Sequence, residues 1–422
     1  MTRFNPFRPG GIVTPGMFAG RLDEVTKLEK GLFQTKHGNP RHFLITGERG
    51  IGKSSLLLDL EWFAKGEVPP ISGEERPNFL VASVILEPTT DYAGLIAKVG
   101  SALRGAVASQ KPALQLAKTL WDFASRWEAA GVKYRAPQQA IDPHAMLDDL
   151  VGIVQNAFAD IKVWFDGILI LIDEADKPPH TAHLGEFVKL FTERLTRIGC
   201  NEVAIGMAGQ PVVLERLADS HESSTRILEV LTLEPLLPNE RKDVVFRALD
   251  AAEDKNGFST QIDAQALEWL ANLSEGYPHF IQQFGYSAFD VDTDDNIDLN
   301  DVFVGAFGEN GAFHQLGIKY FKDLYFEQIN SEEYREVLRA MAKSVDGWVT
   351  KDQIRKETGL RETTLGNAIA ALKSRNIILA QEGKKGVYRL PNKSFALWIG
   401  WITVAKAAGG PTLLAGDTKS DS

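Results

Sequence analysis

The chain is poor in several features that would mark whole classes of protein. It has one cysteine, Cys200, in 422 residues, which excludes an intrachain disulfide and fits a reducing compartment. Basic residues number 46 against 56 acidic ones, so the chain is not built to coat nucleic acid along its whole surface. No apolar run approaches the ~20 residues of a membrane helix, and residues 1–9 lack the apolar core of a signal peptide. These absences predict a cytoplasmic protein with no membrane partner.

What is present is an ordinary globular composition, arranged in successive blocks. Hydrophobic residues make up 44% and charged residues 24%, which is enough for a packed core. The length allows two or three domains. We expect an N-terminal lead-in over residues 1–40, an α/β core over 41–235, a helical segment over 236–325, a separate module over 331–406 and a disordered tail over 407–422.

Within the α/β block, apolar runs of strand length alternate with stretches of helical period, which is typical of a parallel sheet with helices on both faces. The interval between the first and third runs is long, and its residues from about 90 to 160 predict a helical insert. Aromatic residues in this insert form either its own core or a surface for a protein partner; they are Trp121, Phe123, Trp127 and Tyr134. The expected strands are 42–46, 79–86, 167–172 and 203–208.

The strongest motif follows the first expected strand and precedes a helix expected over residues 55–63. It matches the phosphate loop G-x-x-x-x-G-K-[ST] at every position. Glycines let backbone N–H groups turn onto phosphate oxygens, and the following helix adds its positive N-terminal end. Lys53 is expected to face the β- and γ-phosphates, and Ser54 to offer its hydroxyl to Mg²⁺. The residues expected to bind ATP here are Gly47, Glu48, Arg49, Gly50, Ile51, Gly52, Lys53, Ser54 and Ser55.

Two further strand ends carry polar side chains. Asp173 and Glu174 follow the run at 167–172, at the strand end where parallel sheets bind ligands. Asp173 is predicted to hold Mg²⁺ and Glu174 to orient and polarise the attacking water, so the pair favours hydrolysis over nucleotide binding alone. Gln210 follows the run at 203–208 and is either a contact to the γ-phosphate or water, or a polar turn residue.

In this order, these elements resemble those of the AAA+ ATPases, particularly the origin-recognition-type clade and the similar STAND signalling ATPases. Arg21 lies in a segment similar to the family's box near the adenine, and Pro278 and His279 lie where a lid residue meets the nucleotide. Arg226 lies in a segment similar to the one that bears the arginine finger, with Arg216 nearby as the alternative. The resemblance implies a P-loop NTPase core, a helical lid, ATP and Mg²⁺ between them, and a homo-oligomer in which the finger comes from a neighbouring subunit.

The module over residues 331–406 has the pattern of a winged helix-turn-helix. Helical patterns at 334–344, 350–358 and 361–376 precede a hairpin-like stretch at 377–390. The module holds 14 Lys/Arg against 8 Asp/Glu, a charge of +6, which leaves −16 on the rest of the chain. A local basic surplus of this kind is what phosphate contact requires.

Two functions of this module stay open. The first is binding to duplex DNA, with base-edge contacts from the start of the third helix and phosphate contacts from the wing. The second is a protein-contact role in a STAND-type signalling or defence ATPase whose output is protein association without DNA. The candidate DNA-contacting residues are Arg361, Thr363, Thr364, Asn367, Lys384 and Lys385.

Overall fold

A computed structural model of the chain describes most of its length, with one long gap at residues 109–141. The chain forms two compact units, Ile12–Glu234 and a second made of Met1–Gly11 with Pro235–Ser422. The four aromatic residues Trp121, Phe123, Trp127 and Tyr134, and the tail after residue 407, lie outside the described residues. The described residues are 3–12, 18–71, 73, 75–108, 142–329, 331–345, 347–381 and 383–407.

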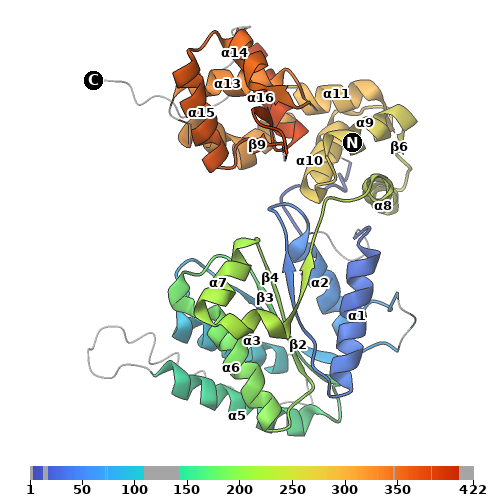
Figure 1. Cartoon of the computed structure of the whole chain (residues 1–422). Coiled ribbons are helices and arrows are strands. Elements are labelled where there is room, and N and C mark those ends of the chain that lie inside the picture. Colours follow the sequence, from blue (N-terminus) through green and yellow to red (C-terminus); the bar gives the residue numbers. More distant parts are fainter. Residues whose placement is uncertain are drawn as a thin grey trace, which may run out of the picture. The chain divides into compact units, whose positions relative to one another are not determined.

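The first unit is built on a five-stranded parallel sheet with the order β2-β3-β4-β1-β5 (Figure 1). All four strands expected from the sequence are present within one residue of their predicted bounds. The strands are β1 His42–Thr46, β2 Phe79–Ile85, β3 Gly167–Asp173, β4 Val203–Gly209 and β5 Leu228–Thr232. The apolar runs of β3 and β4 are buried almost throughout, because helices cover both faces of the sheet.

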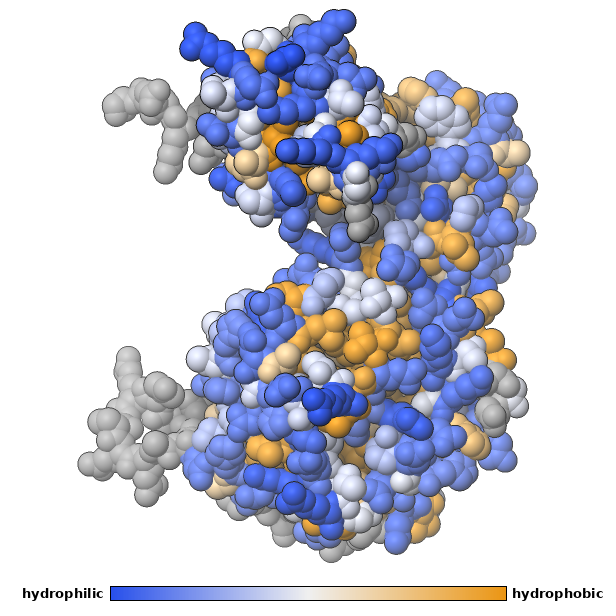
Figure 2. Space-filling view, in the orientation of Figure 1, coloured by the Kyte–Doolittle hydropathy of each residue, from blue (hydrophilic) through white to orange (hydrophobic). Residues whose placement is uncertain are grey.

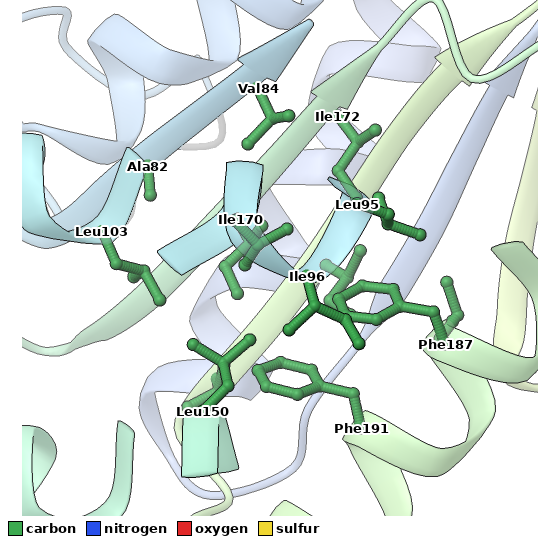
Figure 3. Close-up of a cluster of buried hydrophobic side chains, with 14 of the residues drawn as sticks. Ala82, Val84, Leu95, Ile96, Leu103, Leu150, Ile170, Ile172, Phe187 and Phe191 are labelled. Atoms are coloured by element: carbon green, nitrogen blue, oxygen red, sulfur yellow. The ribbon is translucent and has the colours of Figure 1, made fainter. Parts of the chain in front are cut away.

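Alternate residues of the strands pack under helices on one face of the sheet. Ile170 and Ile172 of β3 lie in a buried cluster with Ile96, Phe187 and Phe191 (Figure 3). The rings of Phe187 and Phe191 stack with centroids 5.4 Å apart. The helices of this unit are α1 Leu22–Lys36, α2 Lys53–Ala64, α3 Tyr92–Ala108, α5 Pro143–Ile161, α6 Leu184–Arg197 and α7 Val212–Ser220. This packing fixes the strand ends that carry the polar residues.

The second unit begins with a helical segment onto which the start of the chain packs. Arg3 forms ion pairs with Asp292 at 2.6 Å and Asp295 at 2.8 Å, and the Phe7 ring lies 6.4 Å from that of Phe289. Residues 3–11 therefore belong with this segment. Its elements are α8 Pro238–Asn256, β6 Gln261–Ile262, α9 Ala264–Leu273, α10 Pro278–Val291, β7 Asn296–Ile297, α11 Leu299–Phe307 and α12 Ala312–Leu316.

Two π-helical stretches, Gly317–Phe321 and Asp323–Glu327, connect this segment to the C-terminal module. The module combines helices with a three-stranded antiparallel sheet of order β8-β10-β9, which is consistent with the predicted winged helix. Thr350 caps the helix Lys351–Thr358 through a capping box with Gln353. The elements are α13 Glu332–Ala342, β8 Val349–Thr350, α14 Lys351–Thr358, α15 Glu362–Ser374, β9 Leu379–Ala380, β10 Val387–Arg389 and α16 Lys393–Ala407.

The last helix, α16, ties the module to the helical segment of the same unit. The indole Nε1 of Trp401 donates to the carbonyl of Phe307 at 3.0 Å, and the fully buried Trp398 packs against Phe321 and Tyr325. Among the helices in the described parts of the chain, none has the length and apolarity that a membrane span requires.

Candidate nucleotide site

The predicted phosphate loop joins β1 to α2, as its sequence context requires. Gly50 and Gly52 have φ angles of 81° and 101°, a region that residues with a Cβ rarely adopt. A Cβ on Gly47 would lie 2.9 Å from Cγ2 of Ile51, so the loop closes tightly on itself. The N-cap residue of α2 is Gly52, which has no side chain to cap the first turn, and the helix starts at Lys53. The backbone N–H groups of this turn can therefore be offered to phosphate oxygens.

Lys53 sits between the loop and a group of carboxylates. Its Nζ donates to the carbonyls of Gly47 and Glu48, both at 2.8 Å. Burial lowers the pKa of Lys53, and the carboxylates of Asp176, Asp173 and Glu174 oppose that shift. The same ammonium group is thus held by the loop and attracted by the acidic end of β3, where the metal and the reacting water are predicted to bind.

The end of β3 presents two carboxylates in different settings. Asp173 accepts the backbone N–H of Glu174 at 2.7 Å, so its carboxylate is held close to the strand. Glu174 has a left-handed φ of 55°, which turns its side chain away from the line of the strand. The Glu174 carboxylate is 45% exposed and has Lys177 as its charged neighbour at 3.7 Å. An exposed carboxylate beside the phosphate loop is suited to binding water.

Gln210, at the end of β4, is held by a residue to which the sequence assigned no role. Both its backbone N–H and its side-chain Nε2 donate to the carboxylate of Asp176, each at 2.9 Å. Asp176 is buried, with 5% of its surface exposed. The sequence did contain a signal, because Asp176 is the third carboxylate in four residues at this strand end. Its partner could not be read from the sequence, since the pairing depends on β3 and β4 being neighbours.

Three arginines near this site differ in what holds them. Arg21 is buried and donates to the carbonyl of Ile51 at 3.2 Å, so it supports the phosphate loop. Arg216 of α7 donates to the backbone carbonyls of Asp176 and Pro178, and is therefore engaged within its own chain. The side chain of Arg226 is 75% exposed, and its ion-pair partner among the described residues is Glu222, at 3.9 Å.

The residues predicted for ATP binding fall on both units. Ser54 and Ser55 lie in the first turn of α2, in the same unit as the phosphate loop and the ends of β3 and β4. Pro278 and His279 form the first turn of α10 in the other unit, where the His279 ring lies 5.2 Å from that of Tyr320. The phosphate loop, the carboxylates and Gln210 therefore lie in one unit. Pro278 and His279 belong to the other unit.

The donor set suits Mg²⁺ held jointly by the protein and a nucleotide. Among the described residues, no group of three His, Cys, Asp or Glu side chains could hold a metal by itself. The strand end instead offers Asp173, and the loop offers the hydroxyl of Ser54. Mg²⁺ is commonly bound by one or two protein oxygens together with substrate phosphates and water. These residues therefore fit Mg²⁺ that arrives with ATP.

The predicted DNA-contacting residues lie on the exposed side of the C-terminal module. Arg361, Thr363 and Asn367 are exposed at the start of α15, and Thr364 is half-buried beside the core residue Leu365. Lys384 and Lys385 are exposed between β9 and β10. Hydrophilic residues predominate over the face of the module visible in Figure 2.

Comparison with known proteins gives likenesses over nearly the whole chain. No protein-family model matches the sequence. An uncharacterized HTH-type transcriptional regulator of Methanocaldococcus jannaschii is 22% identical over 410 residues, covering 94% of this chain and 93% of that protein. The Walker-type ATPase of Pyrococcus abyssi matches with a TM-score of 0.51 and 16% identity over 91% of this chain and 96% of that one. The ORC2 protein of Aeropyrum pernix matches with a TM-score of 0.46 and 15% identity, over 96% and 98% of the two chains.

Proposed function

We propose that this chain, whose fold is similar to that of the Walker-type ATPase of Pyrococcus abyssi, is an AAA+ ATPase that binds and hydrolyses ATP with Mg²⁺ and couples its nucleotide state to DNA binding. The observation that carries the ATPase part is the position of Lys53. It is bonded to the carbonyls of the phosphate loop and lies within the field of the carboxylates at the end of β3. This juxtaposition is what transfer of a phosphoryl group to water requires.

Each residue of the site has a distinct part in this proposal. Ser54 and Asp173 would hold Mg²⁺, which supplies positive charge to the phosphate oxygens when it is bound. Glu174 would accept a proton from the attacking water and orient it. Arg21 would act through the loop, because its guanidinium donates to Ile51. Arg226 of a neighbouring copy would neutralise charge that develops on the phosphate oxygens, and its exposure leaves it able to do so.

The Lys53→Ala variant tests the proposal directly. Loss of the ammonium group should abolish both ATP binding and turnover, because Lys53 is the cation that the loop carbonyls of Gly47 and Glu48 hold beside the phosphate-binding backbone. Lys65→Ala is a matched control, since Lys65 follows the other end of α2 and pairs with Glu61 at 2.6 Å. Turnover in Lys53→Ala near the wild-type rate would show that the site is assigned wrongly.

The Glu174→Gln variant separates hydrolysis from binding. The amide keeps the shape of the side chain and loses the charge that accepts the proton, so turnover should fall about 10²–10⁴-fold while ATP still binds. Loss of ATP binding with this variant would instead make Glu174 a structural residue or a metal ligand. Nucleotide affinity by fluorescence titration and phosphate release measure the two effects separately.

The DNA part of the proposal rests on the charge and exposure of the C-terminal module. Arg361, Thr363 and Asn367 offer donors along the exposed side of α15, and Lys384 and Lys385 add charge between β9 and β10. Several other cations of the module are already paired, such as Lys351 with Glu362 at 2.5 Å, so they contribute less to any DNA contact. The description of the Methanocaldococcus jannaschii protein as a transcriptional regulator of the HTH type supports the same assignment.

Filter binding of labelled duplex DNA, with and without ATP, tests this part. Retention that depends on ATP and weakens with salt is expected, because counterions are released from the phosphates on binding. Absence of retention under all nucleotide conditions would favour the other function, a STAND-type switch whose output is protein association. Light scattering of the same samples would then reveal a nucleotide-dependent change of mass.

A further inference from the structure

We propose that Asp176 is a positioning residue for the ATPase reaction: its buried carboxylate fixes the side-chain amide of Gln210 so that the amide oxygen faces the reacting water. This inference rests on the proposed ATPase function and adds to it a role for a residue that touches neither nucleotide nor metal. Of the two interpretations of Gln210, it takes the one in which Gln210 contacts the attacking water.

The orientation of the Gln210 amide follows from its partner. An ionised carboxylate only accepts hydrogen bonds, so the end of the amide that meets Asp176 at 2.9 Å must be the Nε2 donor. The amide oxygen, Oε1, is repelled by the same carboxylate and lies on the opposite side of the group. Gln210 therefore presents an acceptor to its surroundings, and an acceptor is what a water molecule donates to as it attacks.

Asp176 is itself held in place from several directions. It is buried, its other carboxylate oxygen accepts the backbone N–H of Gln210, and its backbone carbonyl accepts from Arg216. Gly209 leaves room for it, because a Cβ at that position would lie 3.1 Å from Oδ1 of Asp176. The backbone adds a further bond, from the N–H of Ala175 to the carbonyl of Ala208 at 2.9 Å. These bonds between Asp176, Gln210, Ala175 and Ala208 therefore join the ends of β3 and β4.

The position of Asp176 also links it to the phosphate loop. Of the carboxylates that raise the pKa of Lys53 against burial, Asp176 has the largest effect. A single buried charge thus acts on the cation that meets the phosphates and on the amide predicted to meet the water. This arrangement explains why the position holds a carboxylate, since a neutral amide could cap the backbone of Gln210 equally well.

The Asp176→Asn variant separates positioning from mere support. The asparagine can still accept the backbone N–H of Gln210 through its oxygen, but its NH₂ group now faces the Gln210 NH₂. The Gln210 amide must turn over and present a donor to the water. We expect kcat to fall at least about tenfold, while the affinity for a fluorescent ATP analogue stays within about twofold.

Exchanging the carboxylate and the amide between positions 176 and 210 should restore kcat. In the double variant Asp176→Asn with Gln210→Glu, the carboxylate at 210 accepts from the asparagine and presents its second oxygen to the water. Most of the lost kcat should return, whereas Gln210→Glu alone should be strongly impaired because two carboxylates then meet. Asp166→Asn is the matched control: Asp166 precedes the other end of β3 and accepts the backbone N–H of Asn78 at 2.8 Å.

Different results would overturn the positioning role of Asp176 and the proposed ATPase function. Unchanged kcat in Asp176→Asn, or losses of kcat and ATP affinity that run parallel to a lowered melting temperature, would overturn the positioning role. Failure of the double variant to regain activity above the single variant would do the same. The proposed ATPase function itself is wrong if the wild-type chain does not hydrolyse ATP, or if its hydrolysis persists in Lys53→Ala. Either result is separate from any effect of changing Asp176.

Discussion

Acidification should weaken the sheet unit through one histidine at the start of β1. His42 is the first residue of β1, the strand that leads into the phosphate loop, and its Nδ1 accepts the backbone N–H of Ile205 at 3.1 Å. Burial lowers the pKa of His42 from 6.5 to about 4. The bond explains the direction independently, because a protonated Nδ1 carries a hydrogen and can no longer accept one.

The sign and size of the effect follow from proton linkage. Between pH 6.5 and about 4 the unfolded state binds a proton at His42 that the folded state does not, so the free energy of unfolding falls as the pH falls. The slope is about 1.4 kcal/mol per pH unit, which gives an upper limit of about 3 kcal/mol at pH 4. Well above pH 6.5 the imidazole is neutral in both states and contributes no pH dependence.

Urea unfolding of the wild type and His42→Asn over this pH range measures the effect. The Asn Oδ1 can take the place of Nδ1 as the acceptor for Ile205 without titrating. Other groups titrate equally in the two proteins, so the difference between their stability curves isolates His42. The wild type should lose more stability than the variant as the pH falls below 6.5, and parallel curves across the range would refute the reasoning.

Four further expectations concern function and stability. Arg226→Ala should lower turnover about 10³-fold or more without weakening ATP binding, as expected for an arginine finger, whereas Arg216→Ala should lower the melting temperature because it frees the carbonyls beside Asp176. Lys384→Ala with Lys385→Ala should weaken binding to all duplexes alike and reduce the log–log salt slope by about 0.9 per lost phosphate contact, with filter binding as the assay. Glu275→Ala should destabilise the C-terminal unit by about 1–2 kcal/mol in urea unfolding, because it removes the acceptor for two backbone N–H groups of α16.

The strands of the sheet show what periodicity can and cannot predict. The runs that became β1 to β4 are apolar on both faces, so length and composition alone identify them. β5 was not predicted, because it lies at the edge of the sheet and buries only Leu228 and Leu231 among exposed neighbours. An edge strand with two buried side chains has no apolar run to detect.

Some features of the site depend on residues close together in the sequence, and others on residues far apart. The phosphate loop is a contiguous motif whose glycines and lysine act together within a few residues, so the sequence was sufficient to predict it. The pairing of Asp176 with Gln210 spans 34 positions and depends on which strands are neighbours. The engagement of Arg216 with backbone carbonyls is likewise a property of the fold, and it favours Arg226 as the finger.

Within the second unit, the loop before α10 is bonded both to the start of this unit at Leu236 and to the start of α16. The carbonyl of Gly276 accepts the N–H of Leu236 at 2.8 Å. Leu236 is the second residue after Glu234, where the sheet unit ends. Glu275 accepts the N–H groups of Lys393 and Ser394, at 2.6 and 3.0 Å, at the start of α16. Pro278 and His279, which are predicted to meet the nucleotide, form the first turn of α10 directly after this loop. Any displacement of this loop would therefore strain its bonds to α16, and α16 would have to follow the loop or lose those bonds.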